Sequence, residues 1–269
     1  MQVAARGLTF DVKVEGPPDG SPVLLLHGFP QDHREFDLIL PRLHAAGLRT
    51  IAYDQRGYGP RPPGVEAYRL SEAAADAIAI LDELNVPRAH VIGHDWGAQV
   101  AWILAASHAD RLETLTAVSV PHPRALGLAL RARPSQKARF AYMGVFRSPI
   151  AERLLLARNG AVLRAMMSAI GDRAGLYADA MREPGRLTGA LNWYRALSRD
   201  QLAAVGTITV PTTYVWSDKD PVVGLTAALR TADWVEADYQ LVALKGIGHW
   251  VPEEAPGALA DAALARIGV

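Results

Sequence analysis

The sequence predicts an α/β fold, in which a mostly parallel sheet is flanked by helices and a helical segment is inserted before the last strands. Short apolar runs that are typical of buried strands alternate with helical patterns over residues 1–123, and the alternation returns over residues 204–269. Residues 124–203 contain helical stretches and no clear strand. We therefore expect a core in two parts, 1–123 and 204–269, and a helical cap of residues 124–203.

The first part of the core begins with an exposed antiparallel strand, because apolar and mostly polar residues alternate from Leu8 to Val14. The continuous apolar run at 23–26 indicates a buried strand. We expect Ser71 to cap a helix that runs to about Leu84. The other elements of this part are strands at 49–53, 89–92 and 112–120, and helices at 34–46 and 98–105.

The second part has a strand at 212–216, a helix, a strand at 239–244 and a C-terminal helix after Pro252. In the cap, residues 124–200 hold 13 arginines and one lysine against five acidic residues, a net charge of +9. Because the whole chain is neutral, the rest of it is acidic. A basic cap could steer anionic substrates or dock on the core, but we interpret these arginines as a solvated helical surface.

Composition limits the classes of chemistry and partner. The 269 residues include no cysteine, which excludes disulfides and cysteine-ligated metals. The 28 basic and 28 acidic residues give no bias toward nucleic acid or a membrane surface, and no apolar run is long enough to cross a bilayer. The N-terminus lacks the apolar core of a signal peptide. We therefore expect a cytoplasmic protein that acts on a small molecule, either as a monomer or as a homodimer.

The most informative motif is Gly93-His94-Asp95-Trp96-Gly97, which lies between an apolar strand and an apolar helix. It has the form of a nucleophile elbow, a tight strand-to-helix turn whose flanking glycines leave room for the turn. The central residue is aspartate in place of serine. A carboxylate is ionised at neutral pH and can attack a saturated carbon, which forms an ester with the enzyme's own carboxyl group. Asp95 therefore indicates epoxides or alkyl halides as substrates.

Such an ester needs a base that activates water. We choose His249 because it follows the last strand and so lies at the carboxyl edge of the sheet, where open α/β sheets bind ligands. Asp220 follows the preceding strand and would orient the imidazole, with Asp218 as the alternative. The order of nucleophile, acid and histidine along the chain is the order found in hydrolases of this architecture.

Attack by water on the ester creates an oxyanion, which backbone N–H groups stabilise. Phe29 follows the first buried strand and Trp96 follows the nucleophile, so their N–H groups are the expected donors. Between Asp54 and Arg56, which both follow the next strand, we expect an ion pair at the sheet edge. The residues expected to line the substrate pocket are His27, Gly28, Pro30, His94 and, in the cap, Trp193.

Taken together, the motifs resemble those of the α/β-hydrolase superfamily, and within it the epoxide hydrolases of the branch with an aspartate nucleophile. The resemblance covers essentially the whole chain. Haloalkane dehalogenases share this branch and most of its motifs. The resemblance implies the α/β-hydrolase fold with an inserted helical cap, a covalent ester on Asp95, and no cofactor or metal. The motifs that carry it are His27-Gly28-Phe29-Pro30, Asp54-Gln55-Arg56-Gly57-Tyr58-Gly59, Gly93–Gly97, Pro121-His122-Pro123 and Gly248-His249-Trp250.

Epoxide hydrolases resemble one another in using cap tyrosines to protonate the oxygen of the opening ring. Leu191-Asn192-Trp193-Tyr194-Arg195 looks like the second tyrosine motif of the family, and Tyr142 lies at the expected place for the first. A phenol is protonated at neutral pH and can donate a proton or a hydrogen bond. The resemblance therefore implies that Tyr194 and Tyr142 act as the acids that open an epoxide.

Two other functions remain open. Haloalkane dehalogenases resemble one another in binding the halide with two N–H donors, of which Trp96 could be one. Phe29 stands where the second donor is often found, and only Trp193 or Trp102 could replace it. The other alternative is a non-catalytic ligand-binding protein with the same fold, because a fold does not fix a function.

Overall fold

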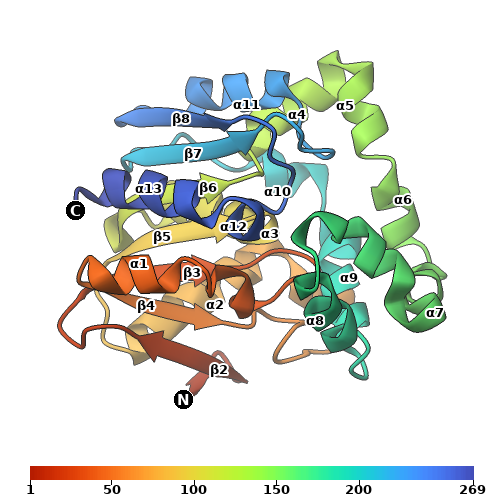
Figure 1. The fold of residues 1–269 in the computed structure, drawn as a ribbon, viewed down its shortest axis with the longest axis horizontal. Helices are drawn as coiled ribbons and strands as arrows, with labels where there is room; N and C mark the ends of the chain where they lie inside the picture. Colours follow the sequence, from red (N-terminus) through yellow and green to blue (C-terminus); the bar gives the residue numbers. More distant parts are fainter.

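The computed structural model describes residues 1–269 and contains an eight-stranded sheet (Figure 1). The strand order is β1-β2-β4-β3-β5-β6-β7-β8. The strands from β4 to β8 in this order pair in parallel, and β2 pairs antiparallel with both β1 and β4. The strands are β1 (Gln2–Ala5), β2 (Leu8–Glu15), β3 (Ser21–Leu26), β4 (Leu48–Tyr53), β5 (Ala89–His94), β6 (Leu112–Val118), β7 (Thr212–Ser217) and β8 (Tyr239–Leu244).

Apolar side chains cover both faces of the sheet, as the continuous apolar strands predict. On β3, Leu24 and Leu26 belong to one buried cluster, and Val23 and Leu25 belong to another, because successive side chains of a strand point to opposite faces. The first cluster includes α2 (Leu70–Glu83) and α3 (Trp96–Ser107), and the second includes η1 (His33–Phe36), α1 (Leu40–Ala45) and α13 (Pro256–Ile267). The sheet is therefore enclosed between two helical layers.

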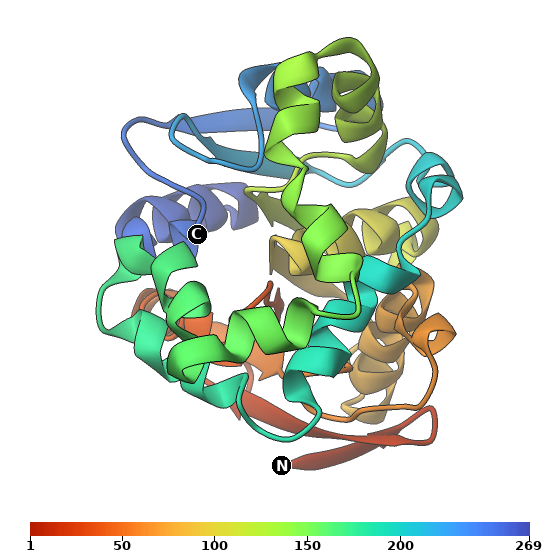
Figure 2. The same cartoon turned by 90° about the vertical axis from the view of Figure 1, so that its right-hand side faces the viewer.

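The segment between β6 and β7 contains helices and loops but no strand of the sheet, and most of it lies to one side of the sheet (Figures 1 and 2). Its helices bring residues far from the elbow in sequence against the edge of the sheet. They are α4 (Pro123–Ala132), α5 (Pro134–Arg139), α6 (Tyr142–Arg147), α7 (Ala151–Met166), η4 (Ser168–Ile170), α8 (Arg173–Ala180), α9 (Arg186–Ala196) and α10 (Arg199–Ala203). The remaining helices are η2 (Val65–Tyr68), η3 (Ala109–Arg111), α11 (Leu225–Arg230), η5 (Thr231–Trp234) and α12 (Val251–Glu254).

Three expectations about elements were wrong or incomplete. The segment 34–46 is not one helix, because the 3₁₀ turn η1 and the short α1 are separated by residues 37–39. Ser71 does not cap α2, which begins at Leu70 after Arg69 and has no side-chain cap. The first strand, β1, was not expected, because its four residues are too short for a clear alternation. None of the helices combines the length and apolar character that crossing a bilayer requires.

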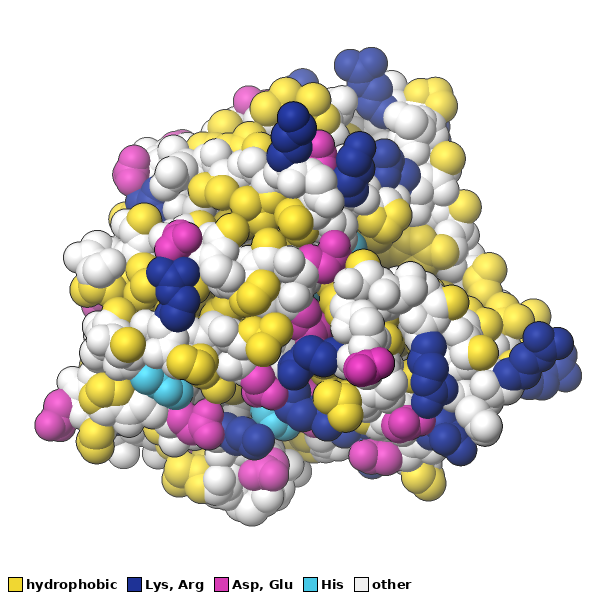
Figure 3. All heavy atoms as spheres, viewed as in Figure 1, with side chains coloured by type: hydrophobic (Ala, Val, Ile, Leu, Met, Phe, Trp, Pro, Cys, Tyr) yellow, Lys and Arg dark blue, Asp and Glu magenta, His cyan; other side chains and the backbone are white.

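Part of the basic charge of the cap docks on the core, so the interpretation as a solvated surface was incomplete. Arg173 on α8 pairs with Glu253, and its nearest nitrogen is 3.7 Å from Asp37. Arg186 on α9 pairs with Asp32 and Asp54. Figure 3 shows basic and acidic side chains interspersed where the cap meets the core. These contacts match the acidic charge of the core to the basic charge of the cap.

The expected pair between Asp54 and Arg56 does not form. Arg56 instead binds Asp76 of α2 through two hydrogen bonds of 2.6 Å, in the bidentate geometry that suits a guanidinium and a carboxylate. Asp54 binds His33 and Arg186. Arg56 therefore binds within the core, whereas Asp54 binds a residue of the cap as well as one of the core.

Candidate active site

The elbow forms where β5 ends and α3 begins. Asp95 has a φ of 51°, a left-handed conformation that a residue other than glycine rarely adopts. The glycines are required by close packing, because a Cβ on Gly97 would overlap the carbonyl oxygen of Leu26 and a Cβ on Gly93 would overlap that of Gly97. The strain is retained because the strand, the helix and these backbone contacts all fix the turn.

The three side chains expected to be catalytic contact one another in the order Asp95, His249, Asp220. His249 Nε2 lies 3.4 Å from Asp95 Oδ2, and His249 Nδ1 lies 2.8 Å from Asp220 Oδ2. Asp220 Oδ1 accepts hydrogen bonds from the backbone N–H groups of Val222 and Val223 at 2.6 and 3.0 Å. All three functional side chains are buried or nearly so. This is the geometry of a nucleophile, a base and a group that orients the base.

The alternative acid does not contact His249. Asp218 is exposed, and its Oδ1 accepts a hydrogen bond of 2.7 Å from the backbone N–H of Gly246. The carboxylate therefore ties the end of β7 to the loop that leads to His249. Its position is that of a turn-stabilising residue.

The charges of the triad shift one another. Burial alone would raise the pKa of Asp95, but the hydrogen bond and the positive charge of His249 outweigh it and lower that pKa. Burial alone would lower the pKa of His249, but the carboxylates of Asp220 and Asp95 outweigh it and raise that pKa. The arrangement therefore favours an ionised Asp95 beside a protonated imidazole.

The expected oxyanion donors flank the nucleophile. The Phe29 N–H donates to Asp95 Oδ1 at 2.9 Å. The Trp96 N–H belongs to the first residue of α3, where no carbonyl of the helix can accept from it. Gly28 is required here, because a Cβ at this position would lie 2.8 Å from Asp95 Oδ1. The Phe29 N–H therefore binds the Asp95 carboxylate, and the Trp96 N–H, which follows Asp95 in the chain, has no partner within its helix.

The two cap tyrosines lie together beside the nucleophile. Tyr194 on α9 is buried, with its ring 4.8 Å from that of Trp96 and 5.3 Å from that of Phe29, and Tyr142 on α6 lies 6.3 Å from Tyr194. Neither hydroxyl donates a hydrogen bond to a protein acceptor, whereas the hydroxyl of the buried Tyr214 donates to a carbonyl; the Trp96 side chain lies close enough to Tyr194 to oppose part of the rise in its pKa. Burial, with the nearby carboxylate of Asp95, raises the pKa of Tyr142. Burial also raises the pKa of Tyr194, so both phenols stay protonated.

Two cavities meet at these groups, and Asp95, Tyr142 and Tyr194 line both of them. The larger has a volume of about 580 Å³ and also reaches His249. The smaller, of about 50 Å³, is lined mainly by apolar side chains. Apolar cavities with a few convergent polar groups are typical of small-molecule sites.

The residues expected to line the substrate pocket line neither cavity, so that expectation was wrong. They form the layer behind the site instead. His27 is fully buried and accepts the backbone N–H of Gln55 at 3.0 Å, and Trp193 donates its indole N–H to the carbonyl of Arg56 at 2.9 Å. The residues concerned are His27, Gly28, Pro30, His94 and Trp193.

A buried acid behind the site was not expected from the sequence. Glu35 of η1 is fully buried, and its Oε2 lies 3.1 Å from His94 Nδ1. His94 Nε2 in turn lies 2.9 Å from the carbonyl oxygen of His249. Burial raises the pKa of Glu35 to about 7, although His94 opposes the shift. No sequence pattern marks Glu35, because a glutamate in a predicted surface helix is usually solvated.

Known proteins resemble this chain over its full length. A model of the alpha/beta hydrolase fold family matches residues 21–256. The "AB hydrolase superfamily protein YfhM" of Bacillus subtilis (strain 168) is 33% identical over 94% of this chain and 92% of its own. "Epoxide hydrolase A" of Mycobacterium tuberculosis (strain ATCC 25618 / H37Rv) is 32% identical over 97% of this chain and 95% of its own.

Solved structures give the same picture. Epoxide hydrolase A from Mycobacterium thermoresistibile is 28% identical, with a TM-score of 0.88 over 100% of this chain and 97% of its own. An epoxide hydrolase from Bacillus megaterium has a TM-score of 0.91 over 100% of both chains at 20% identity, which shows a shared fold.

Proposed function

This chain belongs to the alpha/beta hydrolase fold family, and we propose that it is an epoxide hydrolase that converts an organic epoxide to a vicinal diol. Relatives and structural neighbours that carry this name support the proposal. The observation that carries it is the placement of two phenols, neither of which donates to a protein acceptor, in the same cavity as the buried carboxylate of Asp95. Opening an epoxide needs both a nucleophile and an acid, and this cavity offers them together.

In the proposed first step, Asp95 Oδ2 attacks one ring carbon of the epoxide. Oδ1 already accepts the Phe29 N–H, so it becomes the carbonyl oxygen of the new ester. The ring carbon–oxygen bond breaks, and the oxygen takes a proton from Tyr194, with Tyr142 as a second hydrogen-bond donor. The product of this step is a 2-hydroxyalkyl ester on Asp95.

In the second step, water hydrolyses the ester. Esterification removes the negative charge of Asp95, so the pKa of His249 falls, and the proton that the imidazole releases restores the Tyr194 phenol. The neutral imidazole can then take a proton from water, while Asp220 fixes its tautomer. The hydroxide attacks the carboxyl carbon of Asp95, and the oxyanion on Oδ1 is held by the N–H groups of Phe29 and Trp96. The bond from the carboxyl carbon to Oδ2, which is the alkyl group's oxygen, breaks, that oxygen takes the proton from His249, and the diol leaves. The proton left on the Asp95 carboxyl then passes to His249, which restores the ionised Asp95 and the protonated imidazole.

The dehalogenase alternative has weaker support. The indole N–H of Trp193 donates to Arg56 and that of Trp102 donates to the carbonyl of Val120 at 3.1 Å, so neither is free to bind a halide. Trp96 Nε1 is buried without a partner and is a single candidate donor. One donor stabilises a leaving halide less than two.

A single-turnover reaction of His249→Gln tests the proposal. The variant keeps the nucleophile and the tyrosines but lacks the base, so the ester should form and persist. Intact-protein mass spectrometry and a peptide map after mixing with a panel of epoxides and haloalkanes should find the mass of a whole epoxide on Asp95. An alkyl adduct with halide release would assign a dehalogenase instead. Binding without an adduct or turnover, and unchanged in Asp95→Ala, would indicate a non-catalytic binding protein.

A further inference from the structure

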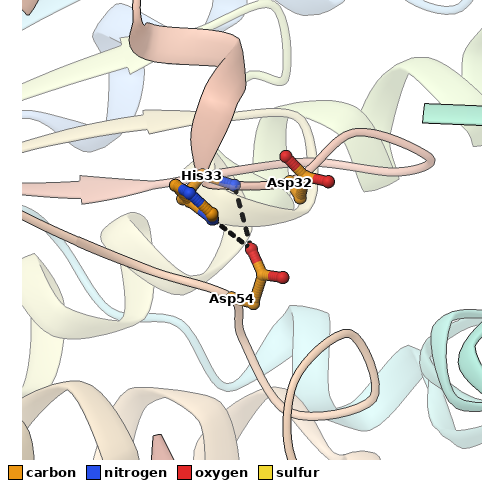
Figure 4. A group of neighbouring side chains, drawn as sticks. All are labelled: Asp32, His33 and Asp54. Atoms are coloured by element: carbon orange, nitrogen blue, oxygen red, sulfur yellow. Dashed lines mark hydrogen bonds and ion pairs between the residues drawn. The ribbon is translucent and has the colours of Figure 1, made fainter. Parts of the chain in front are cut away.

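A polar cluster outside the catalytic contacts joins the cap to the core. It consists of Asp32, His33 and Asp54, whose ligand-type atoms all lie within 4.8 Å of one another (Figure 4). Asp54 Oδ1 accepts from His33 at both the backbone nitrogen, at 3.1 Å, and the ring Nδ1, at 2.6 Å. Two carboxylates this close attract cations. Arg34 of the core pairs with Asp32 at 2.7 Å, and a side chain of the cap reaches both carboxylates.

That side chain is Arg186, at the start of α9. Its Nη2 donates to Asp32 Oδ2 at 3.0 Å and to Asp54 Oδ2 at 2.9 Å, so one nitrogen bridges two core carboxylates. The side chains of Arg186 and Asp32 are 8% and 1% exposed, respectively, so water screens the contact little. Asp32 also pairs with Arg34 and Asp54 with His33, so loss of Arg186 removes the cap's share of this network and leaves the two core carboxylates with fewer partners.

Two further contacts lie on the same face of α9, three and seven residues after Arg186. Gly189 packs against Gly57 so closely that a Cβ on Gly57 would lie 2.7 Å from the Gly189 backbone. Trp193 donates its indole N–H to the carbonyl of Arg56 at 2.9 Å. Because residues at this spacing share one side of a helix, we define the docking face of α9 as Arg186, Gly189 and Trp193.

The residue after this face is Tyr194, whose ring turns toward the cavity at Asp95. The ring of Tyr194 contacts those of Trp96, Phe29, Phe146 and Tyr142. These aromatic contacts are not directional enough to fix the position of α9 along its axis relative to the core. The ion pair at Arg186, about 12 Å along the helix from Tyr194, is directional, and together with the Trp193 hydrogen bond it can fix the helix at two points.

We propose that Arg186 is a positioning residue for Tyr194: by docking on Asp32 and Asp54 it sets where the phenol stands relative to Asp95. The inference rests on the proposed function, in which Tyr194 acts only while the epoxide opens. His249 and Asp220 belong to the core and do not depend on α9. Loss of Arg186 should therefore slow ester formation and leave ester hydrolysis unchanged.

The test measures the two half-reactions separately, with styrene oxide as the probe and rapid quenching followed by mass spectrometry of Asp95. We expect Arg186→Met to slow ester formation about 10- to 100-fold, the scale of a misplacement of about 1 Å. Hydrolysis of the ester once formed should keep its wild-type rate. Arg186→Lys, which keeps the charge but not the planar fork, should restore part of the loss.

The matched control is Arg195→Met on the same helix. Arg195 pairs with Glu152 of α7 at 2.8 Å, within the cap, so its loss should leave the rate of ester formation near the wild-type value. A double-mutant cycle adds a readout that a merely structural role would not give. If Arg186 acts through Tyr194, then Arg186→Met should have no further effect on ester formation once Tyr194→Phe is present.

Several results would overturn the proposal. They are equal slowing of both half-reactions by Arg186→Met, no slowing of either, an equal effect of Arg195→Met, and additive effects in the cycle. If Arg186→Met fails to fold, Arg186→Lys and Arg186→Met with Asp54→Asn replace it, since the latter removes the uncompensated charge. Failure of the proposed function is recognised separately, because wild-type protein would then form no ester with the epoxide panel.

Discussion

Replacing Asp220 by asparagine should block ester hydrolysis by inverting the tautomer of His249. The two backbone N–H groups that bind Asp220 Oδ1, at 2.6 and 3.0 Å, require an oxygen at that position. An asparagine amide must therefore turn its oxygen toward them and its NH₂ group toward His249 Nδ1. The imidazole then accepts at Nδ1 and carries its hydrogen on Nε2, the atom that must take the proton from water.

The size of the effect follows from the cost of the opposite amide orientation. Turning the NH₂ group toward the two N–H groups leaves two buried donors unsatisfied, at about 1–3 kcal/mol each, or about 2–6 kcal/mol in total. Since about 1.4 kcal/mol corresponds to a factor of ten, the productive tautomer should be depleted by about 30- to 10⁴-fold. Ester hydrolysis should slow by that factor, while Asp95 keeps its charge and still attacks the epoxide.

Rapid-quench mass spectrometry of Asp220→Asn with a reactive epoxide measures this directly. We expect nearly all of the enzyme to carry the ester during steady-state turnover. Asp218→Asn is the control, because Asp218 binds only Gly246 and its loss should leave both half-reactions near wild type. Hydrolysis at the wild-type rate in Asp220→Asn, or the absence of any ester in it, would refute the tautomer argument.

Two further predictions concern stability. Burial raises the pKa of Glu35 to about 7, so the folded state holds this proton more tightly than the unfolded chain does. The stability that the proton contributes below about pH 4.5 is therefore lost as pH rises toward 7. Urea titrations should find that the free energy of unfolding falls less over this range in Glu35→Gln than in the wild type, and an equal fall in both would contradict the prediction. Gly189→Ala should lower the free energy of unfolding by about 1–3 kcal/mol, because the new Cβ would overlap the Gly57 carbonyl. Thermal melts of the two variants measure this. Gly175→Ala on α8, where a Cβ meets nothing within 4 Å, should be neutral or stabilising, and an equal loss of stability in Gly189→Ala and Gly175→Ala would contradict the packing argument.

Much of the fold could be predicted from the sequence, because apolar runs and helical periods report directly on burial. The α/β-hydrolase fold is confirmed, and strands such as β3 and β7 lie where their apolar runs indicated. The elements that were missed depend on long-range pairing or on capping. The four residues of β1 form a strand only because they pair with β2, and α2 begins at Leu70 without a side-chain cap.

The candidate site was predictable where order along the chain determines place in the fold. Strand ends at one edge bring Asp95, Asp220 and His249 together, whatever the loops between them do. The lining of the pocket was not predictable in this way. Trp193 and Tyr194 are neighbours in sequence, yet one binds the backbone behind the site and the other faces the cavity, a difference set by the rotation of α9 on the core.

The groups of the site are divided between two parts of the chain. Asp95, His249 and Asp220 belong to the core, as do the backbone N–H groups of Phe29 and Trp96, whereas Tyr142 and Tyr194 belong to α6 and α9. On the proposed mechanism, the core alone carries the chemistry of making and hydrolysing an ester, and the inserted helices decide which leaving atom can be activated. The protein is thus modular at the level of the reaction, and replacement of one continuous insertion could change the electrophile that it accepts without rebuilding its hydrolytic half.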